Sequence, residues 1–256
     1  MTLPPEVGRP VETVERAVEI VDYLKREGPA STADVVAELD CVKSTAHRHL
    51  KTLEANSLVV QEDGEYRVGM RFLDYGIEAR NRNDLFEEAK PRVDDLAAET
   101  EEKIWCAVEE HGRSIHVYGA RGKRSVRTYA RVGHRNYLHQ HAAGKAILAH
   151  LPADRIDGII ERHGLPARTP HTVTDPEVLR AELEETRERG YALNLEESVE
   201  GLHAVGAPIT DEEGLAIGAI SISGPANRLD GDRLRVELPD LLAGAVNEIS
   251  INLAHA

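Results

Sequence analysis

Hydrophobic positions in residues 11–56 recur at the spacing of amphipathic helices. Between residues 11 and 27 five apolar side chains fall on one helical face: Val11, Val14, Val18, Val21 and Leu24. Gly28 and Pro29 end this helix. A short second helix begins at a cap formed by Ser31 or Thr32. A third helix is predicted from about residue 44 to residue 56, with its apolar positions directed inward.

The spacing then changes to the two-residue period of strands. Alternating stretches at residues 58–60 and 66–68 are joined by Glu62-Asp63-Gly64-Glu65, and Asp-Gly is a strong signal for a tight hairpin turn. Three helices followed by a hairpin predict a winged helix-turn-helix domain over residues 10–71.

The remaining chain, residues 72–256, predicts a linker helix and then an α+β domain around an antiparallel sheet. The linker helix spans residues 70–82, and a longer helix over 85–102 contains Pro91, which predicts a break or a restart. Strands are expected at 104–108, 114–118, 126–132, 204–209 and 216–223. Helices are expected at 141–151, 154–163, 176–189 and 232–254, and Thr174 with Glu177 forms a capping box before the third of these.

Composition places the chain in the cytoplasm of a salt-adapted cell. The net charge is −14, and only 7 of the 31 basic residues are lysines, a balance that resembles halophilic proteins with hydrated acidic surfaces. We expect no secretion signal and no membrane-spanning segment. Cys41 and Cys106 lie far apart, so neither a disulfide framework nor a zinc site is expected.

The third helix is locally basic within this acidic chain. Residues 42–53 contain no Asp or Glu. Side chains near the start of such a helix reach base edges, while neighbouring basic and hydroxyl groups hold phosphates. The predicted DNA-binding residues are Lys43, Ser44, Thr45, His47, Arg48 and Lys51 on the helix and Arg67 in the wing. One helix and one wing bury little surface, so a homodimer is expected on double-stranded operator DNA. The alternative is a winged-helix module that binds another protein.

Four ordered segments resemble the IclR family of bacterial and archaeal regulators. They are YRVGMRFLDYG at 66–76, LHQHAAGKAILA at 138–149, GYALNLEESVEGLHAVGAPI at 190–209 and GAISISGPANRL at 218–229. The resemblance implies a winged helix-turn-helix, a linker helix and a GAF-like effector-binding domain. It also implies dimers that often pair into tetramers, and control of a catabolic operon by a small organic acid, such as a sugar acid, keto acid or aromatic acid.

The same resemblance implies a ligand pocket between the sheet and the helix that carries Gly-Lys-Ala. Its lining, transferred to matching positions, comprises Ala143, Gly144, Asn194, Leu202, Ala204, Ser221 and Ser223. Family members often have an acidic residue at the position of Asn194 and a cysteine at that of Ala204. These departures predict a different preference for ligand polarity or size.

A basic segment overlaps the predicted pocket. Residues 111–153 contain eight Lys or Arg and no acidic residue, which leaves −22 on the rest of the chain. Arginine pairs well with carboxylates, and helix N-termini receive anions, so the helix start at residues 142–145, including Lys145, is a candidate carboxylate site. This interpretation favours an anionic effector. The alternative is a solvated edge that contacts acidic patches of another subunit.

No catalytic, metal or cofactor site is predicted. The histidines between residues 134 and 203 match no common zinc spacing. Glu196 and Glu197 are adjacent and have no nucleophile beside them, so a structural role near the pocket mouth is favoured. An enzyme that processes a small acid remains the alternative to a regulator.

Overall fold

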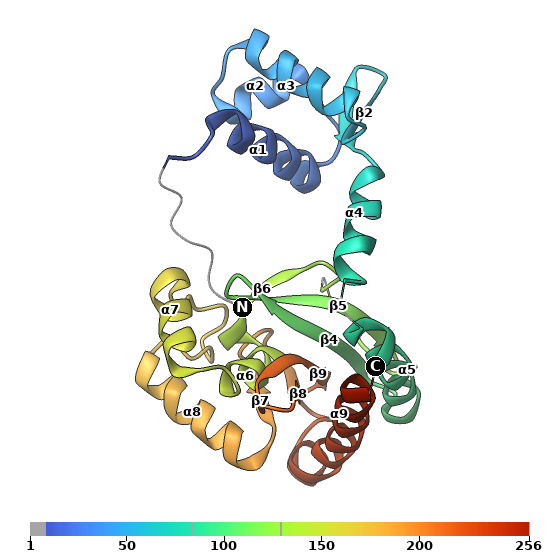
Figure 1. The fold of residues 1–256 in the computed structure, drawn as a ribbon, viewed down its shortest axis with the longest axis vertical. Coiled ribbons are helices and arrows are strands. Elements are labelled where there is room, and N and C mark those ends of the chain that lie inside the picture. The colour runs from blue at the N-terminus through green and yellow to red at the C-terminus, as the bar shows by residue number, and fades with distance from the viewer. Residues whose placement is uncertain (1–8, 83, 129, 256) are drawn as a thin grey trace. The chain divides into compact units, whose positions relative to one another are not determined.

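The computed structural model describes residues 9–82, 84–128 and 130–255. These residues form two compact units, one ending at Arg82 and the other beginning at Asp84 (Figure 1). Each unit has its own hydrophobic core, and each is described by itself below.

The N-terminal unit is the winged helix-turn-helix that the sequence predicts. Its helices are α1 (Glu12–Glu27), α2 (Thr32–Leu39) and α3 (Lys43–Ala55), and its strands are β1 (Ala30–Ser31), β2 (Val59–Glu62) and β3 (Glu65–Val68) in the antiparallel order β1-β3-β2. Asp63 and Gly64 both have positive φ, at 51° and 89°, as a two-residue hairpin turn of the predicted kind requires. The two-residue strand β1 was not predicted.

The buried face of α1 differs from the predicted one. Ile20 and Leu24 are buried and pack in the same cluster as Val35, Ala46 and Leu50. The predicted inward positions Val11, Val14 and Val18 are exposed instead. The prediction was right for Val21 and Leu24 and wrong for these three valines, because the periodic pattern contains two apolar stripes and only the stripe through Ile20 and Leu24 faces α2 and α3. Helix α4 (Arg71–Arg80) follows the wing and buries no side chain in this chain.

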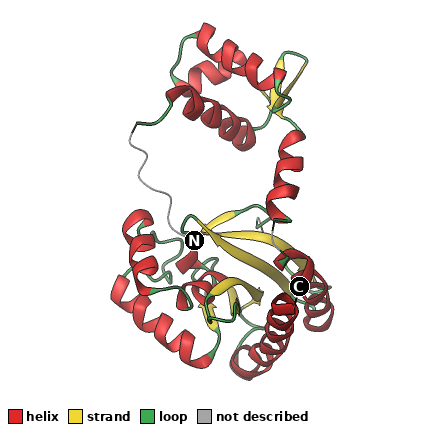
Figure 2. Cartoon of the chain, in the orientation of Figure 1, coloured by secondary structure: helices red, strands yellow, loops and turns green. Residues whose placement is uncertain are grey.

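The C-terminal unit contains a six-stranded antiparallel sheet between two helical layers (Figure 2). The strands are β4 (Lys103–Glu110), β5 (Arg113–Arg121), β6 (Arg135–Tyr137), β7 (Ala192–Leu195), β8 (Leu202–Thr210) and β9 (Ala216–Pro225), in the order β6-β5-β4-β9-β8-β7. The helices are α5 (Leu85–Thr100), α6 (Ala142–Ala149), α7 (Ala153–His163), α8 (Pro176–Arg189) and α9 (Leu238–His255), with a 3-10 turn at Leu138–Gln140 and a π-helical turn at Arg233–Glu237.

Successive side chains along a strand point alternately to the two helical layers that cover the sheet. Ile220 and Ile222 on β9 pack in the cluster formed with α5 and α9, while Ala219 packs with α6, α7 and α8. Successive side chains of a strand point to opposite faces, so Ser221 and Ser223 share the α6 side with Ala219. Every residue of α6 is buried, including Lys145, and the other residues of the helix are all small or apolar.

Glycines allow α6 to lie close to its neighbours. A Cβ at Gly206 on β8 would stand 2.7 Å from Ala143 N, and one at Gly144 would stand 2.1 Å from Leu138 O. Both positions therefore need glycine for close backbone approach, and the start of α6 is fixed against β8 and the turn before it.

Several local predictions were wrong. The described residues of segment 126–132 form no strand, and the edge strand β6 lies at 135–137 instead. Helix α5 continues through Pro91 without a break. Asp175, not Thr174, caps α8 by accepting hydrogen bonds from the N–H groups of Glu177 and Val178. Strand β7 was not predicted.

Candidate functional sites

Helix α3 presents a basic and hydroxyl-rich face. Ala46, Leu50 and Leu53 point into the core of the N-terminal unit. Consequently Lys43, Ser44, His47 and Arg48 are exposed, and Thr45 is half-buried. No acidic residue lies in the first turn of α3, which leaves the positive end of the helix dipole uncompensated and favourable for an anion. The structure thus places five of the predicted DNA-binding residues together.

Lys51 and Arg67 have a different environment. The Lys51 ammonium donates to Glu54 Oε2 at 2.7 Å and to Gln61 Oε1 on β2 at 3.0 Å, and Arg67 pairs with Glu62 across the hairpin. These contacts connect α3 to the wing. Both side chains are exposed. They remain predicted DNA contacts, Lys51 to a phosphate and Arg67 to a phosphate or the minor groove.

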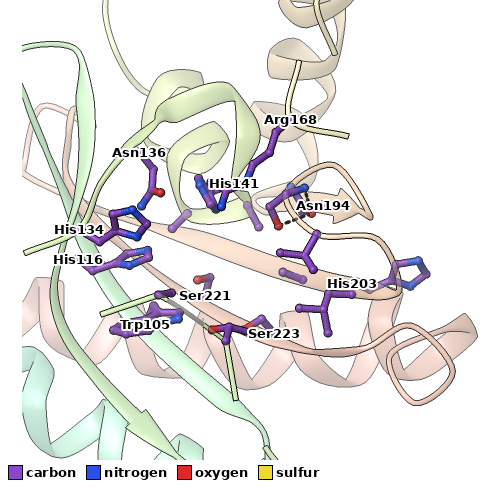
Figure 3. Close-up of a pocket in the computed structure, with 18 residues that line it drawn as sticks. Trp105, His116, His134, Asn136, His141, Arg168, Asn194, His203, Ser221 and Ser223 are labelled. Atoms are coloured by element: carbon purple, nitrogen blue, oxygen red, sulfur yellow. Dashed lines mark hydrogen bonds between the residues drawn. The ribbon is translucent and has the colours of Figure 1, made fainter. Parts of the chain in front are cut away.

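A cavity opens in the C-terminal unit between the sheet and the start of α6 (Figure 3). The empty space within it and at its mouth amounts to about 640 Å³, part of which is open to solvent. Its lining comes from the strands, from the start of α6 and from three loops: Trp105, His116, Thr128, Ala130, His134, Asn136, His141, Ala142, Ala143, Arg168, Asn194, Ser198, Val199, Leu202, His203, Ala204, Ser221 and Ser223.

Most of the predicted effector residues lie in this lining. They are Ala143, Asn194, Leu202, Ala204, Ser221 and Ser223. Gly144 and Lys145 are not among the described lining residues. The other seven Lys and Arg of segment 111–153 are also absent from the described lining. Several uncharged residues of that segment, such as Thr128 and Ala130, do line the cavity. Arg113, for example, lies over the Tyr137 ring, with its guanidinium carbon 3.5 Å from the ring centroid.

Lys145 is held in a buried ion-pair cluster beside the cavity. Its side chain is fully buried, and its ammonium donates to Glu197 at 2.7 Å and 2.8 Å and to Glu182 on α8 at 2.5 Å. Burial raises the pKa of Glu197, while the nearby Lys145 charge opposes that shift. The cluster joins α6, α8 and the β7–β8 loop, and it gives Glu197 the structural role expected from the sequence.

The same loop is joined to the segment that carries Arg168. The Thr172 hydroxyl accepts from the N–H groups of Arg168 at 3.0 Å and Thr169 at 2.9 Å, and it donates to Glu197 O at 2.7 Å. Gln140 donates to Pro166 O at 2.7 Å. These bonds fix the backbone around Arg168, the one arginine among the described lining residues. No sequence motif indicated this residue, because its loop has no regular period.

Asn194 is almost completely buried and uses its amide inside the protein. Its Nδ2 donates to Gln140 O at 2.8 Å, and its Oδ1 accepts from the Ser198 hydroxyl at 3.3 Å (Figure 3). An acidic residue at this position has no donor for Gln140 O. The amide is therefore the side chain that connects the two walls of this cavity.

One end of the cavity is lined by aromatic rings and by the Asn136 amide. His116 stacks on Trp105 with ring centroids 4.3 Å apart and planes at 9°, and His141 stands nearly perpendicular to His116 at 6.1 Å (Figure 3). Burial lowers the pKa of His116 to about 3 and that of His141 to about 4, with neighbouring histidines adding to both shifts. Both imidazoles are therefore neutral at physiological pH. From the sequence, His141 was considered only as a candidate metal ligand and His116 was not singled out, so the convergence of the two rings on the cavity was not predicted.

The described residues were also searched for a metal site, a reactive thiol and a membrane-spanning helix. They contain no group of three or more His, Cys, Asp or Glu arranged to hold a metal ion. The Cys106 thiol is buried, which raises its pKa to about 12. In the part of the chain that was searched, none of the helices combines the length and apolar character that a membrane span requires.

Comparison with known proteins covers both units. The model of the IclR helix-turn-helix domain matches residues 13–63, and that of the C-terminal domain of bacterial IclR regulators matches residues 77–251. A probable HTH-type transcriptional regulator, ArcR of Halobacterium salinarum, is 34% identical over 97% of this chain and 96% of its own length. The HTH-type transcriptional repressor AllR of Escherichia coli K12 is 32% identical over 97% of this chain and 93% of its own.

Solved structures show the same architecture. The IclR protein of Thermotoga maritima superposes with a TM-score of 0.78 at 30% identity, covering 95% of this chain and 99% of that protein. An IclR homologue of Microbacterium hydrocarbonoxydans, solved with 4-hydroxybenzoate, has a TM-score of 0.81 at 24% identity, covering 95% and 100%, and this likeness concerns the fold. A winged helix-turn-helix followed by a cavity-bearing α+β domain, with family matches in both, establishes that the chain belongs to the IclR family of ligand-responsive, DNA-binding transcriptional regulators.

Proposed function

We propose that this regulator binds operator DNA through α3 as a homodimer, and that a small organic acid in the C-terminal cavity changes its operator affinity. The observation that carries the DNA proposal is the exposed, acid-free face of α3 in a chain of net charge −14. Lys43, Ser44, Thr45, His47 and Arg48 contact bases and phosphates, and Lys51 and Arg67 contact phosphates. The target is a catabolic operon, and the regulator acts in the cytoplasm, where its operator is accessible.

The carboxylate of the effector binds at the start of α6. Ala142 and Ala143 belong to the first turn of this helix, whose N–H groups have no acceptor within the helix. Arg168 supplies a positive charge in the lining, and Ser221 and Ser223 supply hydroxyl groups from the sheet. Gly144 and Lys145 act indirectly, since Gly144 sets the approach of α6 and Lys145 holds the adjoining loop. Effector and operator each change the affinity of the other by the same factor.

Exposed apolar side chains of the N-terminal unit support the homodimer. Val11, Val14 and Val18 form a stripe on α1, and α4 and its cap expose Met70, Leu73, Tyr75 and Ile77. A monomer would leave these side chains in water, and a second copy of the unit removes them from it. We further propose that two dimers can pair into a tetramer, as dimers of family members often do.

The dimer is expected to dissociate when its apolar surface receives charge. Val14→Asp combined with Leu73→Asp is expected to raise the dimer dissociation constant by about 100-fold or more, since each buried apolar side chain contributes about 1.5–3 kcal/mol. Analytical ultracentrifugation at micromolar concentration measures this. Val178→Asp, at a similarly exposed valine on α8, is the matched control and should leave the mass unchanged. A parent protein that sediments as a monomer would refute the homodimer.

Loss of the Arg48 side chain is expected to weaken operator binding by about 10- to 100-fold, the usual effect of removing a base contact. The operator is selected from a pool of random duplexes, with the region upstream of the gene included, and affinities are measured by fluorescence anisotropy in dilute and in molar salt. Lys25→Ala on α1 removes the same charge from the same unit and should change affinity by only a few fold. Equal effects of the two variants would contradict readout by α3, and a parent protein that selects no duplex would favour a protein-interaction module.

The cavity binds its acid without converting it. Incubation of the protein with the acid that it binds, followed by chromatography, should return the acid unchanged, and accumulation of a product would favour the enzyme alternative.

A further inference from the structure

The ring-lined end of the cavity contains buried polar atoms that the carboxylate proposal leaves unused. His116 is 4% exposed and Asn136 is 3% exposed. His116 Nδ1, Asn136 Nδ2 and His141 Nε2 have no hydrogen-bond partner among the described residues. A buried polar group without a partner costs about 1–3 kcal/mol, so each such group in a native fold calls for an explanation. All three residues line the cavity, which suggests that a ligand completes their hydrogen bonds.

These atoms are held in place by three different elements. His116 lies on β5, Asn136 on β6 and His141 at the N-cap of α6. Stacking on Trp105 fixes the plane of the His116 ring. Ser114, which also has an unpartnered hydroxyl, is the antiparallel partner of Asn136 in the β5–β6 ladder. The ring nitrogens and the amide are therefore preorganised, which lowers the cost of ordering them when a ligand binds.

The protonation state of this end determines which ligand group fits it. A neutral imidazole presents one N–H donor and one acceptor nitrogen. A hydroxyl group also donates and accepts, so it satisfies either nitrogen without a change of charge. A carboxylate only accepts. It could pair with an imidazole N–H and with the Asn136 amide, but its charge would be buried beside three neutral groups, and burying an ion costs far more than burying a hydroxyl group. An alkyl group would leave all three atoms unpartnered.

We infer that His116, Asn136 and His141 form a second subsite that binds the hydroxyl groups of the effector, so that the effector is a polyhydroxy monocarboxylic acid. The inference rests on the proposed function, because it requires the carboxylate to bind at the start of α6. The aromatic wall suits this ligand as well, since the Trp105–His116 stack presents an apolar surface to the C–H groups between hydroxyls.

Matched acids that differ only in hydroxyl groups test the subsite. The full-length protein is titrated with glycerate, xylonate and gluconate and with propionate, pentanoate and hexanoate, and binding is followed by calorimetry and by the fluorescence of Trp105, the single tryptophan. At least one hydroxylated acid should bind about tenfold or more tightly than its unsubstituted counterpart, because loss of the hydroxyls leaves buried polar groups unpaired. Adipate, which has a second carboxylate, should also bind more weakly than gluconate.

Variants test whether the gain in affinity from the hydroxyl groups arises at this subsite. His116→Phe keeps a ring on Trp105 and Asn136→Leu keeps a similar volume, and each should reduce the affinity for the hydroxylated acid by about tenfold while leaving that for the unsubstituted acid unchanged. Arg113→Gln, on the same strand but outside the described lining, is the control. If unsubstituted acids or adipate bind as tightly as the hydroxylated acids, the second subsite is refuted and the carboxylate site stands. If none of the acids binds, the carboxylate proposal and the inference fail together.

Discussion

Replacing Lys145 by methionine is expected to lower the free energy of unfolding of the C-terminal unit by about 3–5 kcal/mol, the usual effect of breaking a buried ion pair. The Lys145 side chain is completely buried, and its ammonium lies between Glu182 and Glu197. Methionine has a similar length but no charge. It would leave two carboxylates near each other, one of them almost fully buried, without a compensating cation.

The measurement is urea unfolding followed by Trp105 fluorescence. Because Trp105 is the single tryptophan and lies on β4, the signal reports on the C-terminal unit. Lys51→Met is the matched control. Lys51 also pairs with a glutamate, Glu54, at 2.7 Å, but both side chains are partly exposed, and such pairs contribute about 0–1 kcal/mol. The control is followed by circular dichroism, because Lys51 lies in the N-terminal unit.

A second substitution separates charge from packing. Adding Glu197→Gln to Lys145→Met removes the uncompensated charge, so the double variant should be more stable than Lys145→Met alone. A double-mutant cycle gives the coupling between the two side chains. A loss of less than 1 kcal/mol for Lys145→Met, with no coupling, would show that the cluster contributes no more than a surface ion pair.

This cluster also connects stability with the proposed carboxylate site. Glu197 binds Lys145 through its side chain and Thr172 through its backbone carbonyl, and Thr172 in turn binds the backbone of Arg168. Loosening of the cluster therefore moves the loop that supplies the arginine of the lining. Lys145→Met should weaken binding of the acid even at urea-free, fully folded conditions, although Lys145 is not among the described residues that line the cavity.

The sequence predicted the elements whose signals are local. The Asp63-Gly64 turn required two residues that tolerate positive φ, and the hairpin lies at that turn. The strands 204–209 and 216–223 were found from their apolar runs, and the structure only extends them. The GAF-like domain and six of the residues that line its pocket were predicted from the family resemblance, and the comparisons support the fold.

Features that depend on tertiary contacts could not be predicted in the same way. The face that α1 buries is selected by α2 and α3, not by the number of valines on it. Lys145 was assigned to the ligand because it is basic and follows the helix start, but Glu182 and Glu197 approach it from 37 and 52 residues away. His116, Asn136 and Arg168 reach one cavity from three separate segments, and a single sequence contains no signal for that convergence.

Lowering the pH from 6.5 to 5 is expected to destabilise the C-terminal unit by about 3 kcal/mol through His116 and His141, since the dependence of each group approaches about 1.4 kcal/mol per pH unit once the unfolded chain is fully protonated. In the unfolded chain both imidazoles take up a proton near their ordinary pKa of about 6.5. In the folded protein burial lowers the pKa of His116 to about 3 and that of His141 to about 4. Above about pH 7.5 both states are neutral and the histidines have no effect on stability. Below it the unfolded state binds protons that the folded state excludes, so stability falls.

The contribution of one histidine is isolated by His116→Gln, which is neutral at every pH. Between pH 6.5 and 5 this variant should lose about 2 kcal/mol less than the parent, as measured by urea unfolding with Trp105 fluorescence. His171→Gln is the control, because His171 is exposed in the same unit. Burial lowers the pKa of His139, His150 and His163 in the same direction, so acid sensitivity should decrease in the variant without disappearing. Identical pH profiles for parent and His116→Gln would mean that His116 takes up a proton in the folded protein as readily as in the unfolded chain. A protonated ring has no acceptor nitrogen, and the second subsite would then favour an anionic group over a hydroxyl.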